Sequence, residues 1–238
     1  MKNLSTLPWL TTAQMVEVDR LMIEEWHINL VQMMENAGRN LAELVKRYLG
    51  GSISGKQVIV LSGTGNNGGG GMVAARHLHN WGAAVELILI GSVDKLKKIP
   101  EQQLKIIQKM GLITQDPDLK SADLIVDAMI GYGLTGDPLP PISDWVALAN
   151  ASHTPILALD APTGLDATTG VPSSNCIRAT ITLTLALPKI GLKTPEAKPF
   201  VGDLYLADIS VPPELYTSPS LGLEMVSPFN TEPIIKLL

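Results

Sequence analysis

A glycine-rich segment, Gly63 to Gly71, is the clearest sign of chemistry in the sequence. It follows an apolar run of strand length, and Gly63, Gly65 and Gly68 satisfy the pattern G-x-G-x-x-G. In that pattern, backbone N–H groups at the start of a helix receive a phosphate. A tight turn without a ligand is the alternative, but adjacent asparagines and four successive glycines exceed what a turn requires. We therefore expect a phosphate or nucleotide site.

Two familiar classes of nucleotide site fit this segment poorly. A dinucleotide dehydrogenase needs an acidic residue about 20 positions later, at the end of the next strand, to hold the ribose. Glu86 lies inside that strand and Asp94 comes too late. No lysine follows the glycines as in the P-loop of kinases and ATPases.

Oxygen-bearing side chains follow three apolar runs and suit a hard cation. Asn66 and Asn67 lie in the glycine-rich segment, Asp127 lies within a later run, and Thr163 follows the next one. Neutral oxygens with a single carboxylate favour a weakly charged ion over zinc and leave room for a monovalent cation. For Asp127, a cap at the end of a strand that bonds the next loop is the alternative.

Metal sites built on sulfur or imidazole are not expected. Cys176 is the only cysteine, which excludes an internal disulfide and agrees with a reducing cytoplasm. The four histidines do not cluster, because His77 and His79 are two positions apart on a predicted helix and point to different faces.

The elements that must position these residues alternate between strand and helix. Short apolar runs predict strands at 58–61, 85–90, 124–130, 156–159 and 181–187, with helices at 72–81, 100–110 and 142–150 between them. Two helices precede the first strand, and the first begins with a capping box of Thr11 and Gln14. We predict an α/β fold, a Rossmann-like three-layer αβα sandwich with a mainly parallel sheet and two N-terminal helices. In such a sheet the loops after the strands meet at one rim.

The chain is predicted to be a single domain over residues 1–238, with a core at about 11–210. A strand at 203–209 is expected at the sheet edge, and the apolar tail of residues 211–238 is interpreted as the start of a linker to a further domain. A net charge of −5 argues against nucleic acid as a main partner. No signal peptide or membrane-length apolar run is seen, so we expect a cytoplasmic protein.

Several motifs together resemble those of the YjeF N-terminal domain family, over about residues 11–209. In chain order they are TAQM (12–15), MENAG (34–38), GNNGG (65–69), VAARHL (73–78), DAMIGYGL (127–134), DAPTGLD (160–166) and PKIG (188–191). Their order along the chain makes the combination far more specific than one glycine loop.

The resemblance implies epimerisation of the R and S forms of hydrated NADH and NADPH, a nucleotide-repair reaction, with a potassium ion beside the substrate. It assigns the potassium ligands to Asn67, Asp127 and Thr163. It also implies that a hydrate dehydratase is a fused or separate partner, and leaves the oligomeric state open, with a homodimer as one arrangement. The positions that resemble substrate contacts are Asn66, Asn67, Gly68, Gly69, Gly70, Gly131, Tyr132, Gly133, Leu134, Thr135, Gly136, Asp137 and Asp160.

One position departs from the family pattern. The family usually reads NNGGDG, whereas this chain has Gly70 in place of the aspartate. The loop therefore lacks a carboxylate, which bears on substrate affinity or on the ordering of the loop. A ligand-binding or scaffold domain of the same family, with weakened catalysis, is the alternative function.

The epimerisation needs an acid and a base. In the hydrate, the ring nitrogen can expel hydroxide, and water can return to either face of the resulting iminium. Asp160 is our first candidate because a carboxylate at a strand end can protonate the departing hydroxyl and deprotonate the returning water. Asp137 is the second candidate. Lys189 can polarise the leaving oxygen or hold a phosphate, and an ordinary loop lysine is the alternative for that residue.

Overall fold

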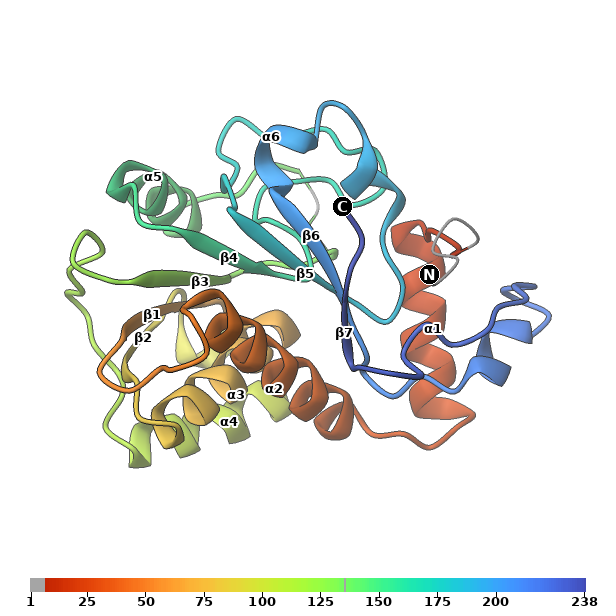
Figure 1. Cartoon of the computed structure of the whole chain (residues 1–238), viewed down its shortest axis with the longest axis horizontal. Coiled ribbons are helices and arrows are strands. Elements are labelled where there is room, and N and C mark those ends of the chain that lie inside the picture. Colours follow the sequence, from red (N-terminus) through yellow and green to blue (C-terminus); the bar gives the residue numbers. More distant parts are fainter. Residues whose placement is uncertain (1–6, 135) are drawn as a thin grey trace.

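The computed structural model describes residues 7–134 and 136–238. Within these ranges, seven strands form one sheet in the order β2-β1-β3-β4-β5-β6-β7 (Figure 1). The strands are β1 (Gln57–Ser62), β2 (Ala84–Leu89), β3 (Leu124–Ala128), β4 (Ile156–Leu159), β5 (Ile181–Leu185), β6 (Asp203–Ala207) and β7 (Ile234–Lys236). The first six are parallel to their neighbours, and β7 is antiparallel to β6. The predicted α/β architecture with a mainly parallel sheet is confirmed.

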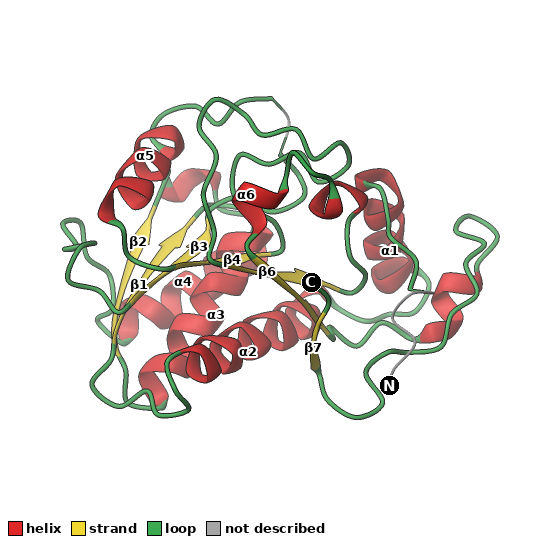
Figure 2. Cartoon of the chain, turned by 45° about the horizontal axis from the view of Figure 1, so that its top comes forward, coloured by secondary structure: helices red, strands yellow, loops and turns green. Residues whose placement is uncertain are grey.

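Helices cover both faces of the sheet. They are α1 (Thr12–Glu24), α2 (Leu30–Tyr48), α3 (Asn66–Asn80), α4 (Lys98–Lys109), α5 (Ile142–Ser152) and the short α6 (Lys198–Val201). In Figures 1 and 2, α2, α3 and α4 lie on one side of the sheet and α5 and α6 on the other, while α1 lies to the right of the sheet in both views. The capping box predicted at Thr11 is present, since Thr11 and Gln14 bond each other's backbone N–H groups.

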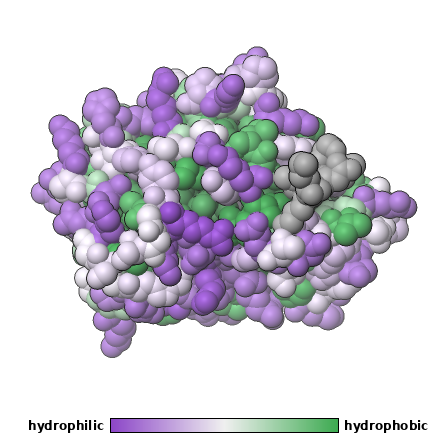
Figure 3. Space-filling model, in the orientation of Figure 1, coloured by the Kyte–Doolittle hydropathy of each residue, from purple (hydrophilic) through white to green (hydrophobic). Residues whose placement is uncertain are grey.

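The alternation of side chains along the strands divides the core into two layers. Val58 and Val60 of β1 pack with the cluster that includes α2, α3 and α4, whereas Ile59 and Leu61 pack with the cluster that includes α5. This is the alternation expected of a sheet buried on both faces. On the face shown in Figure 3, hydrophilic residues dominate the periphery and hydrophobic ones gather near the middle.

Several predicted strands differ from the structure, and the one predicted at 181–187 ends at Leu185. The strand predicted at 124–130 ends at Ala128, because Asp127 Oδ1 accepts the N–H of Met129 and Thr163 Oγ1 accepts the N–H of Ile130, which takes the backbone out of the ladder. The strand predicted at the sheet edge, 203–209, is covered by β7. The apolar tail, interpreted as a linker, thus supplies a buried strand, since Ile234 and Ile235 pack into the core.

The glycine run is helical, contrary to the predicted loop. Helix α3 begins at Asn66 and includes Gly68 to Gly71. Glycine costs about 1 kcal/mol relative to alanine inside a helix, but close packing requires it here. A Cβ on Gly71 would lie 2.5 Å from the Cβ of Ala128 on β3. Similarly, a Cβ on Gly38 of α2 would lie 2.5 Å from Val73 of α3. The glycines therefore allow α3 to approach both α2 and the sheet.

Candidate active site

A cavity of about 580 Å³ lies at the carboxyl ends of β1, β3 and β4. This volume is within the range of about 300 to 1,000 Å³ that is typical of small-molecule sites. All three predicted loops contribute to its wall, together with α1 and α2. The polar lining residues are Asp19, Thr64, Asn66, Asn67, Lys97, Tyr132, Asp160 and Lys189, and the apolar ones include Met15, Leu30, Met33, Met34, Met129 and Ile209.

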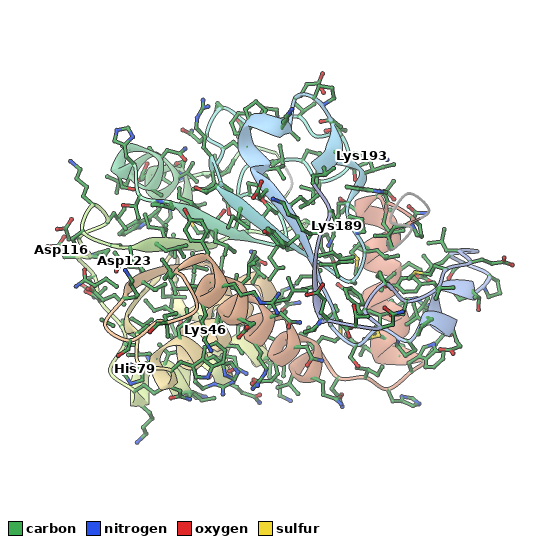
Figure 4. The ribbon with its side chains drawn as sticks, viewed as in Figure 1. Lys46, His79, Asp116, Asp123, Lys189 and Lys193 are labelled. Atoms are coloured by element: carbon green, nitrogen blue, oxygen red, sulfur yellow. The ribbon has the colours of Figure 1, made fainter. Side chains whose placement is uncertain are left out.

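Asp160 and Lys189 form a buried ion pair at this wall. Lys189 Nζ lies 2.5 Å from Asp160 Oδ1, and both side chains are almost wholly buried. The ammonium also donates to Thr184 Oγ1 at 3.2 Å and to the carbonyl of Leu185 at 3.0 Å, so its three donors are all used. Figure 4 shows Lys189 in the interior, between the sheet and α1. The reading of Lys189 as an ordinary loop lysine is wrong.

The backbone at Asp160 is held in an unusual conformation. Its φ is +69°, a left-handed value that few residues other than glycine adopt, although aspartate tolerates it better than most. The N–H of Asp160 still donates to the carbonyl of Leu183 on β5 at 2.7 Å. The sharp turn after β4 directs the carboxylate to the cavity, where it meets Lys189.

Tyr132 connects three charged groups. Its backbone N–H donates to Asp160 Oδ2 at 2.9 Å, and its ring centroid lies 5.5 Å from Lys189 Nζ. Its hydroxyl donates to Asp19 Oδ2. Asp19 was not among the predicted site residues. The available signal was an acidic residue within the buried stripe of α1, between Val18 and Met22.

Asp127 is a buried carboxylate beneath the site. Its Oδ1 accepts from Thr163 Oγ1 at 2.7 Å and from the N–H of Met129 at 3.1 Å, and its Oδ2 accepts the N–H of Thr163 at 2.8 Å. Burial raises the pKa of Asp127 to about 6 despite these hydrogen bonds. No residue within 7–134 or 136–238 forms an ion pair with it. The hydrogen bond from the Met129 N–H agrees with the alternative prediction, in which Asp127 caps the end of a strand.

Asn67 and Asp160 meet around Gly131. Asn67 Nδ2 donates to the carbonyl of Leu159 at 3.2 Å, which leaves its Oδ1 turned to Gly131. A Cβ on Gly131 would lie 2.8 Å from Asp160 Oδ2 and 3.1 Å from Asn67 Oδ1. The N–H of Ile130, one residue earlier, donates to Thr163 Oγ1 at 3.0 Å. The three residues assigned to potassium are thus linked through the backbone after β3.

The family of the chain follows from a match to a family model. The model described as "YjeF-related protein N-terminus" matches residues 30–191, more than half of the chain. The chain belongs to this family.

Three proteins of similar sequence match most of the chain. A protein of Dehalogenimonas lykanthroporepellens named NAD(P)H-hydrate epimerase is 42% identical over 96% of this chain and 92% of its own length. One of Rhodopirellula baltica with the same name is 34% identical over 90% of this chain and 89% of its own length. A bifunctional NAD(P)H-hydrate repair enzyme of Moorella thermoacetica is 37% identical over 86% of this chain, which spans only 41% of that relative.

The fold of this YjeF-related chain has a solved counterpart. The crystal structure of the yeast protein YNL200c has a TM-score of 0.80 at 24% identity, and the match covers 97% of this chain and all of that one. At this identity the likeness concerns the fold. It agrees with the Rossmann-like architecture predicted from the alternation of strands and helices.

Several predicted substrate contacts of the YjeF-related chain lie outside the cavity wall. Gly68 and Gly69 are packing positions: a Cβ on Gly68 would lie 1.9 Å from the carbonyl oxygen of Gly63, and one on Gly69 would lie 2.6 Å from the sulfur of Met34. Asp137, the second catalytic candidate, is exposed and accepts a hydrogen bond from Ser174 at 2.9 Å. Leu134 and Gly136 do not line the cavity either, and Thr135 lies outside the described residues.

Proposed function

We propose that this chain is an NAD(P)H-hydrate epimerase, which interconverts the R and S forms of hydrated NADH and NADPH. The observation that carries the proposal is the buried ion pair of Asp160 and Lys189 at the wall of a nucleotide-sized cavity. The relatives of D. lykanthroporepellens and R. baltica carry this name over almost the same length of chain. The geometry supplies both groups that the chemistry needs.

The reaction needs one proton to be given to the departing hydroxyl and one to be removed from the returning water. In the hydrated ring, the nitrogen lone pair forms a C=N bond as the C–O bond breaks, and the departing hydroxyl takes a proton and leaves as water. Water then adds to the other face of the iminium, loses a proton, and closes the C–O bond with inverted configuration. No net oxidation occurs and the proton is conserved, so one acid and base group is sufficient.

The Asp160 and Lys189 pair is suited to this proton transfer. The ammonium of Lys189 holds the proton next to the carboxylate, and the pair can release it to the departing hydroxyl at the cavity wall. Asp160 then receives the proton of the returning water and passes it back to Lys189, which restores the ion pair. Burial strengthens such electrostatic interactions and keeps the geometry fixed, which reduces reorganisation during the reaction.

The nucleotide part of the substrate meets the start of α3. Thr64, Gly65 and Asn66 line the cavity, and Gly65 is the N-cap of the helix. The first N–H groups of a helix are unpaired and carry a partial positive charge, which favours a phosphate. Gly70 lines the same wall, where the family pattern would place a carboxylate.

The oxygen donors of Asn67, Asp127 and Thr163 support the proposal of a potassium ion beside this site. Asp127 carries a buried charge with no cationic partner in the described ranges, and a cation would compensate for it. We infer that Asn67, Asp127 and Thr163 hold the ion. Its chemistry would be to lower the local negative potential and orient oxygen atoms of the substrate.

A partner reaction is also proposed. Epimerisation alone does not remove the hydrate, so an activity that dehydrates one epimer must follow, in a fused or separate chain. The bifunctional repair enzymes, of which this chain spans about two fifths, support this pairing.

None of the helices in the described ranges is long and apolar enough to cross a membrane. From the single cysteine, which suits a reducing compartment, we infer that the protein acts in the cytoplasm.

The test starts from one purified epimer of hydrated NADH. Chromatography follows its conversion to the other epimer with wild-type protein, with Asp160→Asn and with buffer alone. We expect wild-type protein to exceed the spontaneous rate and Asp160→Asn to lose most of that acceleration. A wild-type rate equal to the buffer rate would leave a ligand-binding role in place of the enzyme.

A further inference from the structure

The carboxylate of Asp19 lies in the cavity wall but has no role in the reaction described above. It belongs to α1, whereas Asp160 follows β4 and Asp127 lies near the end of β3. Its hydrogen bond to the Tyr132 hydroxyl joins residues 113 positions apart in the chain. The fold therefore brings a carboxylate from a distant part of the sequence to the site of the Asp160 and Lys189 pair.

Helix α1 is tied to the backbone around Lys189. The N–H of Leu10 donates to the carbonyl of Pro188 at 2.8 Å, and the N–H of Ile190 donates to the carbonyl of Leu10 at 2.9 Å. Thr12, at the start of the helix, bonds Thr168 through its N–H at 2.9 Å. The buried stripe of α1 packs against residues after β5 and β6. Asp19 is therefore carried on an element whose position is fixed relative to the ion pair.

Tyr132 is the residue through which Asp19 reaches Asp160. One Asp160 oxygen bonds Lys189 and the other accepts the N–H of Tyr132, so the carboxylate has a partner on each side. Tyr132 lies in the loop after β3, next to Gly131 and Gly133, which have no side chains to fix the backbone. The hydrogen bond from the Tyr132 hydroxyl to Asp19 therefore holds the far end of the Tyr132 side chain.

The protonation states favour this arrangement. Burial raises the pKa of Tyr132, and the neighbouring charge of Asp19 raises it further, so the hydroxyl keeps its proton and donates it. Burial and the like charge of Asp160 raise the pKa of Asp19, and the hydrogen bond from Tyr132 and the charge of Lys189 offset only part of that rise.

We propose that Asp19 is a positioning residue: by holding the Tyr132 hydroxyl, it fixes the Tyr132 peptide N–H against Asp160 and so orients the catalytic carboxylate. This inference rests on the proposed function, because it assigns a role in the same reaction. It also gives α1 a part in catalysis beyond packing against the residues after β5 and β6.

The kinetic test compares four variants. Asp19→Ala removes the acceptor, Asp19→Asn keeps an oxygen acceptor for the hydroxyl, Tyr132→Phe removes the donor, and the fourth combines Asp19→Ala with Tyr132→Phe. Glu24→Ala, an exposed acidic position on the same helix, is the control. We expect kcat to fall roughly tenfold in Asp19→Ala with a smaller change in KM, because a misplaced catalytic group slows the reaction step.

The pattern among the variants separates positioning from a merely structural role. We expect Asp19→Asn to recover most of the lost kcat, Tyr132→Phe to match Asp19→Ala, and the double variant to be no slower than either single one. Wild-type kcat in Asp19→Ala would overturn the proposal. So would losses that multiply in the double variant, since the two residues would then act independently.

A spectroscopic measurement keeps the inference testable if the wild-type protein shows no epimerase activity. Ultraviolet resonance Raman spectra report whether a tyrosine hydroxyl donates a strong hydrogen bond. We expect the difference between wild type and Asp19→Ala to show the loss of one donating tyrosine, and this difference to vanish in the Tyr132→Phe background. An unchanged tyrosine signal in Asp19→Ala would contradict the contact itself, independently of the reaction.

Discussion

Lys189 Nζ lies 2.5 Å from Asp160 Oδ1, in a part of the molecule from which solvent is almost entirely excluded. Removing two charges from water costs several kcal/mol for each ion, and the cost is recovered only when the geometry is close and the remaining donors are paired. Both conditions hold here, because Thr184 and Leu185 accept the other two N–H groups of the ammonium. Each of the two buried charges is therefore stable in the interior only while the other is present.

Removing one charge of the Asp160 and Lys189 pair should therefore destabilise the protein more than removing both charges. We expect Lys189→Met to lower the free energy of unfolding by about 3 to 5 kcal/mol, because it leaves the Asp160 carboxylate buried without a counter-charge. The combination of Lys189→Met with Asp160→Asn should recover part of that loss while remaining inactive. Urea unfolding checks both expectations, and a double variant less stable than Lys189→Met would refute the coupling.

The missing carboxylate at position 70 can be restored. A Cβ on Gly70 would lie 2.8 Å from the terminal Leu159 Cδ2, and outside its own helix no other atom of the described residues lies within 4 Å, so a small movement of one side chain is sufficient. We expect Gly70→Asp to lower KM or raise kcat. Steady-state kinetics on the hydrate epimers gives the answer, and unchanged values would show that the loop does not need this carboxylate.

Gly71, the next residue of the same helix, is the matched control. A Cβ on Gly71 would meet the Cβ of Ala128 at 2.5 Å, and that atom belongs to a buried strand that cannot move aside easily. Gly71→Ala should therefore destabilise the protein by about 1 to 3 kcal/mol through overpacking. Equal stability of Gly71→Ala and wild type in thermal unfolding would mean that α3 does not need its glycine for close approach.

Potassium should stabilise the folded protein through Asp127. A ligand that binds only the folded state raises the free energy of unfolding by mass action. We expect the unfolding midpoint to rise in potassium chloride relative to choline chloride at the same ionic strength, and Asp127→Asn to remove the difference. Identical midpoints in the two salts for the wild-type protein would argue against a potassium site.

The contact between α2 and α3 should depend on pH through Glu35. Glu35 Oε2 lies 2.5 Å from Arg76 Nη2, and Oε1 lies 2.8 Å from His77 Nε2. Burial raises the pKa of Glu35, but the hydrogen bonds from Arg76 and His77 outweigh it and lower the pKa overall. A lowered carboxyl pKa contributes stability above the unfolded-state pKa, and this contribution is lost as the pH falls through the folded-state pKa.

Glu35→Gln measures that contribution. Because the Glu35 side chain is 42% exposed, we expect a loss of no more than about 1 kcal/mol at neutral pH. The variant and the wild type should become equally stable as the pH falls below the folded-state pKa of the carboxyl. A stability difference that stays constant with pH would assign the effect to packing.

The architecture was predictable because its signals are local. Short apolar runs separated by helical periodicity identify the six parallel strands, and Thr11 with Gln14 marks the start of α1. Strand β7 escaped prediction because an antiparallel edge strand of three residues gives too short a pattern. The glycine run escaped as well, since helix propensity disfavours glycine and only the packing of α3 against Ala128 explains it.

The site was predictable only where the parallel sheet fixes the loop positions. That rule brings Asn67, Gly131 and Asp160 together at one rim. It says nothing about α1, which reaches the site by packing, so Asp19 was missed. It also placed Asp137 with its loop, although the structure turns that side chain to the surface beside Ser174.

The most direct test of the account is epimerisation in water enriched in oxygen-18. If hydroxide leaves and solvent water returns, each newly formed epimer carries one solvent oxygen, and label and epimer appear at the same rate. Asp160→Asn should slow both by roughly 100-fold or more, the usual contribution of an acid and base group. Formation of the new epimer without label, or at the wild-type rate in Asp160→Asn, would contradict the proposed role of the Asp160 and Lys189 pair.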